Sequence, residues 1–450
     1  MKKSKAKKCV KILVITAVTL VLLFFTAHLL INHFEQYIID GFIAKIVKKS
    51  KTIHSIHYDK IDLNFFERSI RVENLSINGD EESGYKFKAV FPEIHIEGIS
   101  IQKLVFNKLF YIKRLFIYDW EVIFPGEFYT LKAKELRFSK ARSSIYVNLL
   151  ELIPKHERYE FARKRGYRSN RMRLKIRSLI FRGIGFKDLF KNRKLSVKVL
   201  RIKKPQLDLF RNKNVPKRPN PREKKLPQQL LRELKFKLRI DNINISKGKI
   251  TYSEHAKNEK IPGKISFSDI QADVKNVTNY PDLLEKKVSS MLTASTKLMD
   301  KSILKIKVTM PINDKQNRFK FSGSLGKIRL NEFKSMFENN AHIRINSGIT
   351  DYLSFSAKAD NRKAIGEMHF LYHHLKISVL KKGGNYKKKK FLSFLTNTII
   401  FNSNPRSGKP VRIGIISYKP EKKLTIFNYM WESLLSGIKS SIGLRKSRRR

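Results

Sequence analysis

The sequence predicts a mainly β protein: an elongated, twisted antiparallel sheet or groove built from repeated strand units, with an N-terminal transmembrane helix and a C-terminal amphipathic helix. Three observations support this fold class. Apolar and polar residues alternate with period two from about residue 53 onward, which indicates strands with one dry and one wet face. The alternation recurs as a unit along the chain. A long uncharged segment precedes it.

The amino-terminal segment predicts a membrane anchor. Residues 12–31 carry no charge, and a helix of that length measures about 30 Å, enough to cross the hydrocarbon core of a bilayer. Bulky Leu29 and Leu30 follow Ala27, so the sequence lacks a small-residue cleavage site and we expect the helix to be retained. The lysines of residues 1–11 favour a cytoplasmic amino terminus, and the lysines of residues 45–51 weaken that preference without reversing it.

Two β-rich regions are expected after the anchor, over residues 32–210 and 231–426. A degenerate unit recurs within them and starts at Leu174 and again at Leu238. Its apolar positions are Leu174, Ile176, Leu179, Phe181, Ile184 and Phe186 in one copy and Leu238, Ile240, Ile243, Ile245, Ile250 and Tyr252 in the other. We interpret each copy as strand, short break, strand, glycine turn and strand, repeated to extend the sheet.

Two segments interrupt the strand pattern. Residues 211–230 are rich in proline and in cations, which predicts a basic linker or exposed loop between the two regions. Residues 148–169 carry charges at helical spacing around Leu149, Leu150, Leu152 and Ile153. This spacing predicts a short helix inserted in the sheet.

The last segment, residues 427–450, predicts an amphipathic helix followed by a basic tail. Its apolar residues fall on one helical face and are Phe427, Met430, Trp431, Leu434, Leu435, Ile438 and Ile442. One interpretation is a helix that caps the end of the sheet. The other is a helix that contacts an anionic membrane, and its contact residues are then Phe427, Trp431, Leu434 and Leu435.

The net charge is extreme and constrains the partners. The 95 Lys and Arg residues against 38 Asp and Glu residues give a formal charge of +57, which attracts phospholipid headgroups, lipopolysaccharide phosphates or nucleic acid. The alternative is a solvated surface without a specific partner. The cations alternate with apolar residues along nearly the whole chain, whereas nucleic-acid-binding domains gather them in one patch. The single cysteine, Cys9, excludes an intramolecular disulfide.

The sequence contains no motif typical of catalysis or of cofactor binding. Gly323, Gly326 and Lys327 have the wrong spacing for a phosphate-binding loop. His369, His373 and His374 form a histidine cluster. A metal site there would need a third convergent ligand and a second shell of hydrogen bonds. The alternation around the cluster instead favours two of the histidines on the polar face of a strand. We therefore expect a protein that is not an enzyme and that holds no cofactor and no metal.

Five features form a recognisable combination: the anchor, residues 240–252, the strand with Gly366 and Met368, the dipeptide Asn404–Pro405, and residues 427–437. Together they resemble the AsmA-like family of bacterial envelope proteins. The resemblance implies a β-groove anchored in the inner membrane of a Gram-negative bacterium, related to bridge-like lipid-transfer proteins. The amino terminus is then cytoplasmic and the bulk of the chain periplasmic. Phospholipid transport or outer-membrane assembly is the implied function, without catalytic residues. This chain departs from the family in being unusually basic and rather short.

A sheet that is apolar on one face must cover that face, because soluble proteins rarely expose so much apolar surface. We expect lipid acyl chains to act as the missing layer, with phospholipid or another anionic lipid as the partner. The candidate groove residues are Ile61, Leu63, Leu174, Ile176, Leu238, Ile240, Ile243 and Ile245. The expected function is thus an inner-membrane-anchored periplasmic protein that holds acyl chains and contributes to phospholipid transport or outer-membrane biogenesis.

Two alternatives remain at this point. One is a non-transporting envelope scaffold or assembly factor with outer-membrane or other envelope proteins as partners. The other is a basic nucleic-acid-binding protein, which we do not favour. About twenty strands at roughly 4.8 Å each would span on the order of 100 Å. We expect this length to be too short to cross the envelope without a partner or an oligomer.

Overall fold

The computed structural model describes residues 53–64, 66–79, 87–99, 112–124, 126, 128–192, 194–220, 223–256, 261–341, 343–379, 400–421 and 424–444. The predicted basic tail (residues 1–11), the predicted transmembrane helix (residues 12–31) and residues 445–450 of the predicted carboxy-terminal tail lie outside these residues. Within the described part of the chain, no helix combines the length and the apolarity that crossing a membrane requires.

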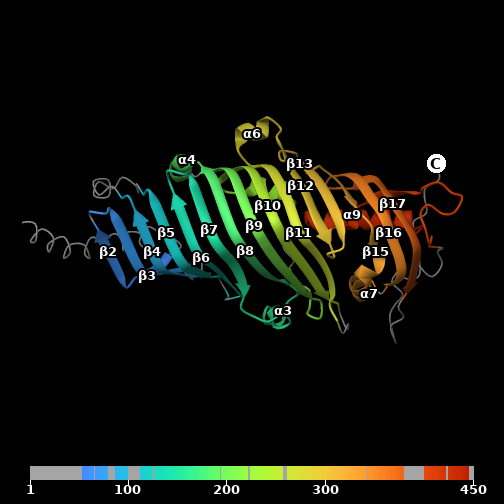
Figure 1. Cartoon of the computed structure of the whole chain (residues 1–450), viewed down its shortest axis with the longest axis horizontal. Helices are drawn as coiled ribbons and strands as arrows, with labels where there is room; N and C mark the ends of the chain where they lie inside the picture. The colour runs from blue at the N-terminus through green and yellow to red at the C-terminus, as the bar shows by residue number, and fades with distance from the viewer. Residues whose placement is uncertain are drawn as a thin grey trace, which may run out of the picture.

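One sheet of 18 strands makes up most of the described chain and confirms the predicted mainly β fold (Figure 1). In chain order the strands are β1 (Ile53–His57), β2 (Lys60–Asn64), β3 (Ser69–Gly79), β4 (Lys88–Glu97), β5 (Arg114–Ile123), β6 (Tyr129–Ser139), β7 (Ser144–Pro154), β8 (Asn170–Ile184), β9 (Lys194–Asn212), β10 (Lys237–His255), β11 (Gly263–Thr278), β12 (Ser289–Leu298), β13 (Ser302–Pro311), β14 (Phe319–Leu325), β15 (Ile328–Arg329), β16 (Ile343–Ala359), β17 (Ala364–Val379) and β18 (Ile413–Tyr418).

The strands follow one another across the sheet in chain order, so that sequence neighbours are neighbours in space. β1 and β2 both pair with β3 and together form one edge, and β14 and β15 both pair with β16. β18 pairs with β17 at the other end. Figure 1 shows an elongated, twisted sheet that stays open and does not close on itself.

Helices flank the sheet. They are α3 (Glu160–Lys164), α4 (Phe186–Asn192), α5 (Pro227–Glu233), α6 (Pro281–Glu285), the 3-10 helix η2 (Leu330–Phe333), α7 (Lys334–Ala341) and α9 (Ile426–Ser441). Prolines open α5 and α6, where the missing N–H is not needed for an intrahelical bond. α9 confirms the predicted carboxy-terminal helix and lies across the last strands of the sheet (Figure 1).

The repeated units are long single strands, which corrects the predicted unit of three strands with breaks. The unit from Leu174 lies in β8, apart from its last residue, and the unit from Leu238 lies in β10. The apparent breaks are points where the alternation shifts by one residue. One line of shifts crosses the sheet at residues of positive φ, which are Asn74, Asp119, Leu149, Lys204 and Lys247. Because the apolar spacing changes there from two to three, each strand keeps its apolar residues on one face.

Residues 148–169 contain the predicted short inserted helix, but only in their second half. The first part of this segment belongs to β7, and only Glu160–Lys164 is helical. The prediction was wrong for residues 148–154, which belong to β7, because Leu149 has a φ of 50° and shifts the alternation of this strand. Val147 and Leu150 thus lie three residues apart on the same face, and three residues is also a helical spacing.

The one parallel pairing among the described strands joins two antiparallel halves of the sheet. β9 and β10 pair in parallel along their whole length. Parallel neighbours require a crossover connection, and residues 213–236 provide it. The predicted linker, residues 211–230, therefore contains the end of β9, an irregular stretch and the start of α5. The sheet continues without a gap across this point.

The main hydrophobic core lies in the carboxy-terminal half of the sheet. Its large side chains come from β14, β16 and β17 and include Phe319, Phe321, Phe355, Phe370 and Tyr372. Tyr429 and Met430 of α9 pack on the same core. A smaller cluster lies where β8, β9 and β10 meet α4 and consists of Ile184, Phe186, Val197, Leu200 and Ile240.

Candidate functional site

One face of the sheet, which we call the apolar face, is apolar from edge to edge. Directly opposed residues on neighbouring strands point to the same side, so a row can be followed from strand to strand. The first row runs through Ile61, Val72, Ile94, Ile117, Leu136, Val147, Leu179, Ile202, Ile245, Ala272, Ala294, Ile306, Gly323, Phe355, Met368 and Gly414. It contains no polar side chain.

A second row lies two residues away from the first on every strand. It runs through Leu63, Ile70, Ile96, Leu115, Phe138, Ile145, Phe181, Leu200, Ile243, Val274, Leu292, Val308, Phe321, Ala357, Gly366 and Ile416. This row is also free of polar side chains. The apolar face is therefore a continuous apolar strip that crosses the strands at right angles to their direction.

The opposite face carries charged residues that pair across neighbouring strands. Lys132 Nζ lies 2.8 Å from a carboxylate oxygen of Glu121, and Lys175 Nζ lies 3.0 Å from one of Glu151. Both lysines are half exposed, so each pair contributes less than about 1 kcal/mol to the free energy of unfolding. The charged face is thus solvated, and the apolar face is the side of the sheet whose exposure to water costs free energy.

The amino-terminal part of the apolar face has only a partial second layer from the described chain, where Phe186 of α4 packs against the cluster's neighbours Phe138 on β6 and Ile145 on β7. β5 has a paired strand on each side, yet none of its residues is fully buried. In β16, by contrast, fully buried residues recur along the whole strand. Intermediate burial along this interior strand indicates that its apolar side is only partly covered, although Val72, Ile94 and Val147 of the first row are buried on β3, β4 and β7. We define the open part of the apolar face as the apolar side of β2 to β7.

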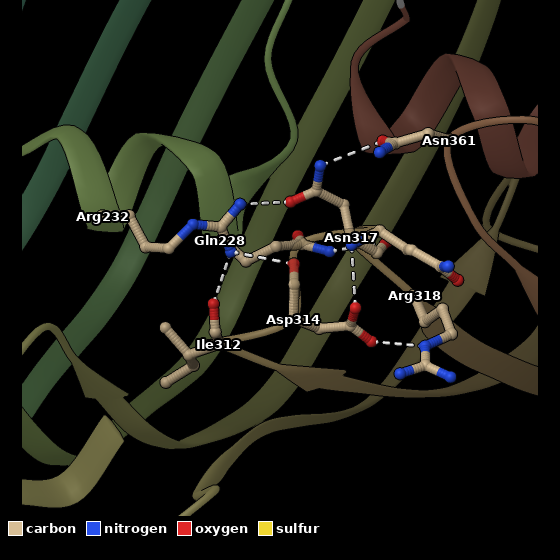
Figure 2. A network of polar contacts seen from close by, with 8 residues as sticks. Gln228, Arg232, Ile312, Asp314, Asn317, Arg318 and Asn361 are labelled. Atoms are coloured by element: carbon tan, nitrogen blue, oxygen red, sulfur yellow. Dashed lines mark hydrogen bonds and ion pairs between the residues drawn. The ribbon is translucent and has the colours of Figure 1, made fainter. Parts of the chain in front are cut away.

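A polar network holds α5 over the middle of the apolar face (Figure 2). The Arg232 guanidinium donates to the carbonyl oxygen of Ile312 and to the side-chain oxygen of Asn317. Gln228 Nε2 donates to the carbonyl oxygen of Asn317 at 3.0 Å, and Asn317 Nδ2 donates to Asn361 Oδ1 at 3.0 Å. The acceptors for α5 lie in the turn between β13 and β14, so the crossover is fixed to strands far from it in sequence.

Asp314 stabilises the turn that receives α5. Its carboxylate accepts hydrogen bonds from Arg318 Nε at 2.6 Å and from the Gln316 N–H at 2.9 Å. Burial is the largest single influence and raises the pKa of Asp314, but the hydrogen bonds and the charge of Arg318 outweigh it. The pKa of Asp314 therefore lies below its usual range.

An apolar cavity of about 310 Å³ lies between α5 and the sheet. Its walls are formed by Pro227, Gln228, Leu230, Leu231 and Leu234 on one side and by Val274, Val277, Ser290, Met310 and Ile312 on the other. Val274 belongs to the second apolar row, so the apolar face continues beneath α5. The volume is at the lower end of the range for small-molecule pockets.

α9 covers the carboxy-terminal end of the apolar face through small residues. Ser433, Gly437, Ser440 and Ser441 are buried on the side of the helix that faces the sheet. A Cβ atom at Gly437 would lie 2.9 Å from a side-chain carbon of Ile416, so only glycine fits this contact.

The outer edge of β18 is hydrogen-bonded to the same helix. The Ile415 N–H donates to Ser440 Oγ at 3.0 Å, and the Ser417 N–H donates to Ser436 Oγ at 3.1 Å. A further strand can pair here only by displacing these hydroxyl groups. The sheet is thus closed to extension at this end.

No family model matches this chain, and no curated protein is detectably similar to it in sequence. The resemblance to the AsmA-like family stays a prediction. Function is argued below from the apolar face.

The predicted groove residues all lie on the apolar face. Ile61 and Ile245 belong to the first row, and Leu63 and Ile243 belong to the second. Leu174 and Ile176 oppose Leu207 and Pro205 of β9, and Leu238 and Ile240 pack in the cluster beside α4. Of these residues, Ile61 and Leu63 lie in the open part as defined here. The predicted set is thus spread from one edge to the middle of the sheet.

The residues predicted to contact a membrane through α9 have different surroundings. Phe427 is 75% exposed and Trp431 is 44% exposed, while Leu434 and Leu435 are half-buried. Leu434 packs against the main core. The capping interpretation of this helix agrees with its position over β17 and β18, and membrane contact through the two exposed aromatic residues remains a prediction.

Sequence reasoning did not assign the middle of the open part to the site. Ile117, Leu136 and Val147 stand in one row with Ile61, but they come from strands separated by turns of different lengths. Period-two alternation marks each of them as facing a dry side. Only the pairing register shows that these sides are the same one.

The histidine cluster has a local partner. His373 Nδ1 lies 2.8 Å from Asp351 Oδ2, and the His373 ring meets the His374 ring edge to face. Among the described residues, no group of three histidine, cysteine or acidic side chains is placed to hold a metal ion.

Proposed function

We propose that this chain is a membrane-anchored, non-enzymatic protein of the bacterial envelope that holds lipid acyl chains on the open part of its apolar face. In this role it contributes to phospholipid transport or outer-membrane biogenesis. The observation that carries the proposal is the continuous apolar row from β2 onward, together with the absence of fully buried residues in β5.

The energetics favour an acyl chain as the occupant. Burial of one methylene contributes about 0.8 kcal/mol, so a sixteen-carbon chain contributes roughly 10 kcal/mol before entropic losses. The open part has no polar side chain in its two rows to fix a ligand at one position. A chain bound there can slide from strand to strand, which suits transfer better than storage.

The position of the open part also supports loading from a membrane. The edge strands β1 and β2 are the first described elements after the predicted anchor. The two apolar rows begin on β2, at Ile61 and Leu63. A lipid that leaves the inner membrane beside the anchor would meet this edge first.

Site-specific photo-crosslinking tests the proposal. A photoreactive phenylalanine analogue is placed at Leu136, which lies on the apolar face, or at Arg137, the next residue on β6, which is exposed on the opposite face. We expect phospholipid adducts of the full-length chain from position 136 and few from position 137, as measured by mass spectrometry after irradiation in a Gram-negative host. Equal yields at the two positions, or no lipid at position 136, would contradict the proposal.

A second candidate, a scaffold for other envelope proteins, is favoured by one observation. Ile365, Ile413 and Ile415 lie side by side on the face of β17 and β18 opposite to α9 and are 47–50% exposed. Exposed apolar residues in a group often mark a protein contact. The scaffold predicts that a stoichiometric protein partner co-purifies with the wild-type chain and is lost in the Ile413→Lys, Ile415→Lys variant, while lipid adducts at position 136 are absent.

A further inference from the structure

The apolar face ends in charged residues on β8, β9 and β10. Met172, Leu209 and Tyr252 oppose one another in the last apolar row of these strands. The next row towards the strand ends consists of Asn170, Arg211 and Glu254. An apolar strip thus leads directly to a polar row on the same side of the sheet.

Two more cations join this row from the neighbouring loops. Arg168 Nη2 donates to the carbonyl oxygens of Lys213 at 2.7 Å and Val215 at 3.3 Å, which ties the loop before β8 to the loop after β9. Lys213 Nζ lies 2.5 Å from one carboxylate oxygen of Glu254. We call Arg168, Arg211, Lys213 and Glu254 the cationic cluster.

Positive charge exceeds negative charge within the cationic cluster. Glu254 is its only carboxylate, and the second oxygen of Glu254 already accepts a hydrogen bond from the Tyr252 hydroxyl at 2.7 Å. Burial lowers the pKa of Arg168. The nearby Arg211 lowers it further, because the two guanidinium groups repel each other.

The two arginines also have unused donors. The Nε–H groups of Arg168 and Arg211 are shielded from water and donate to no acceptor among the described residues. A shielded donor without an acceptor costs free energy, and more so when the donor group is charged. Excess positive charge and unpaired donors at one place indicate an anionic acceptor from outside the described chain.

We propose that the cationic cluster binds the phosphate headgroup of a lipid whose acyl chain lies along Met172, Leu209 and Leu207 on the apolar face. This inference rests on the proposed function, extends the lipid-binding surface from the open part to the neighbouring strands β8 and β9, and adds the headgroup class and its position. A phosphate group accepts several hydrogen bonds at once and matches the fork geometry of guanidinium groups.

The neighbouring apolar residues favour a lipid phosphate over a free phosphate ion. Met172 is 38% exposed beside the cluster, although it belongs to the apolar row. An inorganic phosphate ion would leave this side chain in water, whereas the first methylenes of an acyl chain would cover it.

Binding measurements with two matched single-chain lipids test the inference. Palmitoyl lysophosphatidic acid and monopalmitoylglycerol share one acyl chain and differ in the phosphate. The full-length chain is kept in solution with an amphipathic polymer, and both lipids are titrated below their micelle concentrations by calorimetry. We expect the phosphate-bearing lipid to bind at least about tenfold more tightly to the wild-type chain.

Two variants of β9 locate this preference. Arg211→Gln is expected to reduce it to less than about twofold and to leave the affinity for monopalmitoylglycerol unchanged. Arg201→Gln removes the same charge from the opposite face of the same strand and is expected to keep the preference. Arg211→Lys keeps the charge and is expected to restore part of the preference, which separates headgroup binding from a folding defect.

The possible results distinguish the two proposals. Equal affinity of the wild-type chain for both lipids overturns the headgroup inference but supports acyl-chain binding. No binding of either lipid overturns the proposed function as well. An equal loss of preference in Arg201→Gln and Arg211→Gln assigns the preference to general charge and overturns the inference.

Titration with inorganic phosphate is the last comparison. If inorganic phosphate binds as tightly as the phosphate-bearing lipid, and if Arg211→Gln abolishes this binding, the cationic cluster is a site for the free ion. This result overturns the lipid assignment.

Discussion

Single residues with positive φ allow the apolar face to stay continuous. At each of these residues the spacing between successive apolar residues changes from two to three. Without this shift, the apolar residues that follow would point to the polar face. Asn74 and Asp119 tolerate this conformation, because short polar side chains adopt it at low cost. Gly183, on β8, adopts it without a side chain and has a φ of 66°. Local backbone conformation thus determines which face of a long strand carries its apolar residues.

Gly183→Ala is expected to destabilise the fold strongly. A Cβ atom at this position would lie 2.6 Å from Lys198 Cγ on β9, and alanine is also strained at positive φ. We expect the free energy of unfolding to fall by about 2–4 kcal/mol in urea titrations. Gly166→Ala is the control, because Gly166 has a φ of 72° with no atom within 4 Å of an added Cβ, and a loss of about 1 kcal/mol is expected there. Equal losses for the two variants would show that packing against Lys198 is unimportant.

At the scale of elements, the crossover between β9 and β10 places a helix over the apolar face beyond the hydrophobic cluster at α4. Its helix, α5, is only a few residues long and has no strong intrinsic stability. Arg232 and Gln228 fix it to the turn between β13 and β14, and its leucines line the cavity whose opposite wall includes Val274 and Met310. Polar contacts to a turn far away in the sequence thus hold this short helix in place.

The turn that receives α5 is expected to weaken in acid. The folded-state pKa of Asp314 is lowered, so ionised Asp314 stabilises the fold above its unfolded-state pKa of about 3.9, and this contribution is lost as the pH falls through the folded-state value. Asp314→Asn should therefore lower the free energy of unfolding by about 2 kcal/mol at pH 7 and by progressively less below about pH 4. Urea titrations at several pH values measure this difference.

The exposed Asp282 in α6 offers a control with the same charge change. Asp282→Asn is expected to change stability by less than about 0.5 kcal/mol at any of these pH values. A pH-independent effect of Asp314→Asn would contradict the assigned role of the ionised carboxylate.

At the scale of the whole molecule, the sheet has two unlike ends. The carboxy-terminal end is covered by α9, and the edge of β18 donates its N–H groups to serines of that helix. At the amino-terminal end the apolar rows begin on the edge strand β2. Since β1 and β2 share one position, as do β14 and β15, the sheet spans only about 70 Å across its strands. This span is less than the sequence suggested and strengthens the expectation that a partner or an oligomer completes any path across the envelope.

Hydrogen exchange is expected to separate the two halves. Amides of β5 should exchange faster than those of β16, because β5 lacks a second layer. Monopalmitoylglycerol at about a hundred times its dissociation constant should slow exchange in β5 by up to roughly a hundredfold and leave β16 unchanged. Mass spectrometry of peptides from the full-length chain measures both effects. Uniform protection of the two strands would argue against binding confined to the open part.

The sequence alone determined the mainly β fold, the one-sided strands and the carboxy-terminal helix, because alternation and helical periodicity are local properties of the chain. It also pointed to apolar residues that all prove to lie on one face. Two local interpretations failed, at the repeated units and at residues 148–154, because a spacing of three arises both from a helix and from a strand with a positive φ residue.

Only the tertiary structure decided the register, the parallel junction and which part of the apolar face is covered. These features depend on contacts between residues far apart in the chain: Gln228 and Asn317 are separated by 89 positions. The same holds for the cationic cluster, which joins loops before β8 and after β9 through Arg168 and Lys213. Sequence periodicity reports the side to which a residue points, but it carries no information on which distant segment lies over that side.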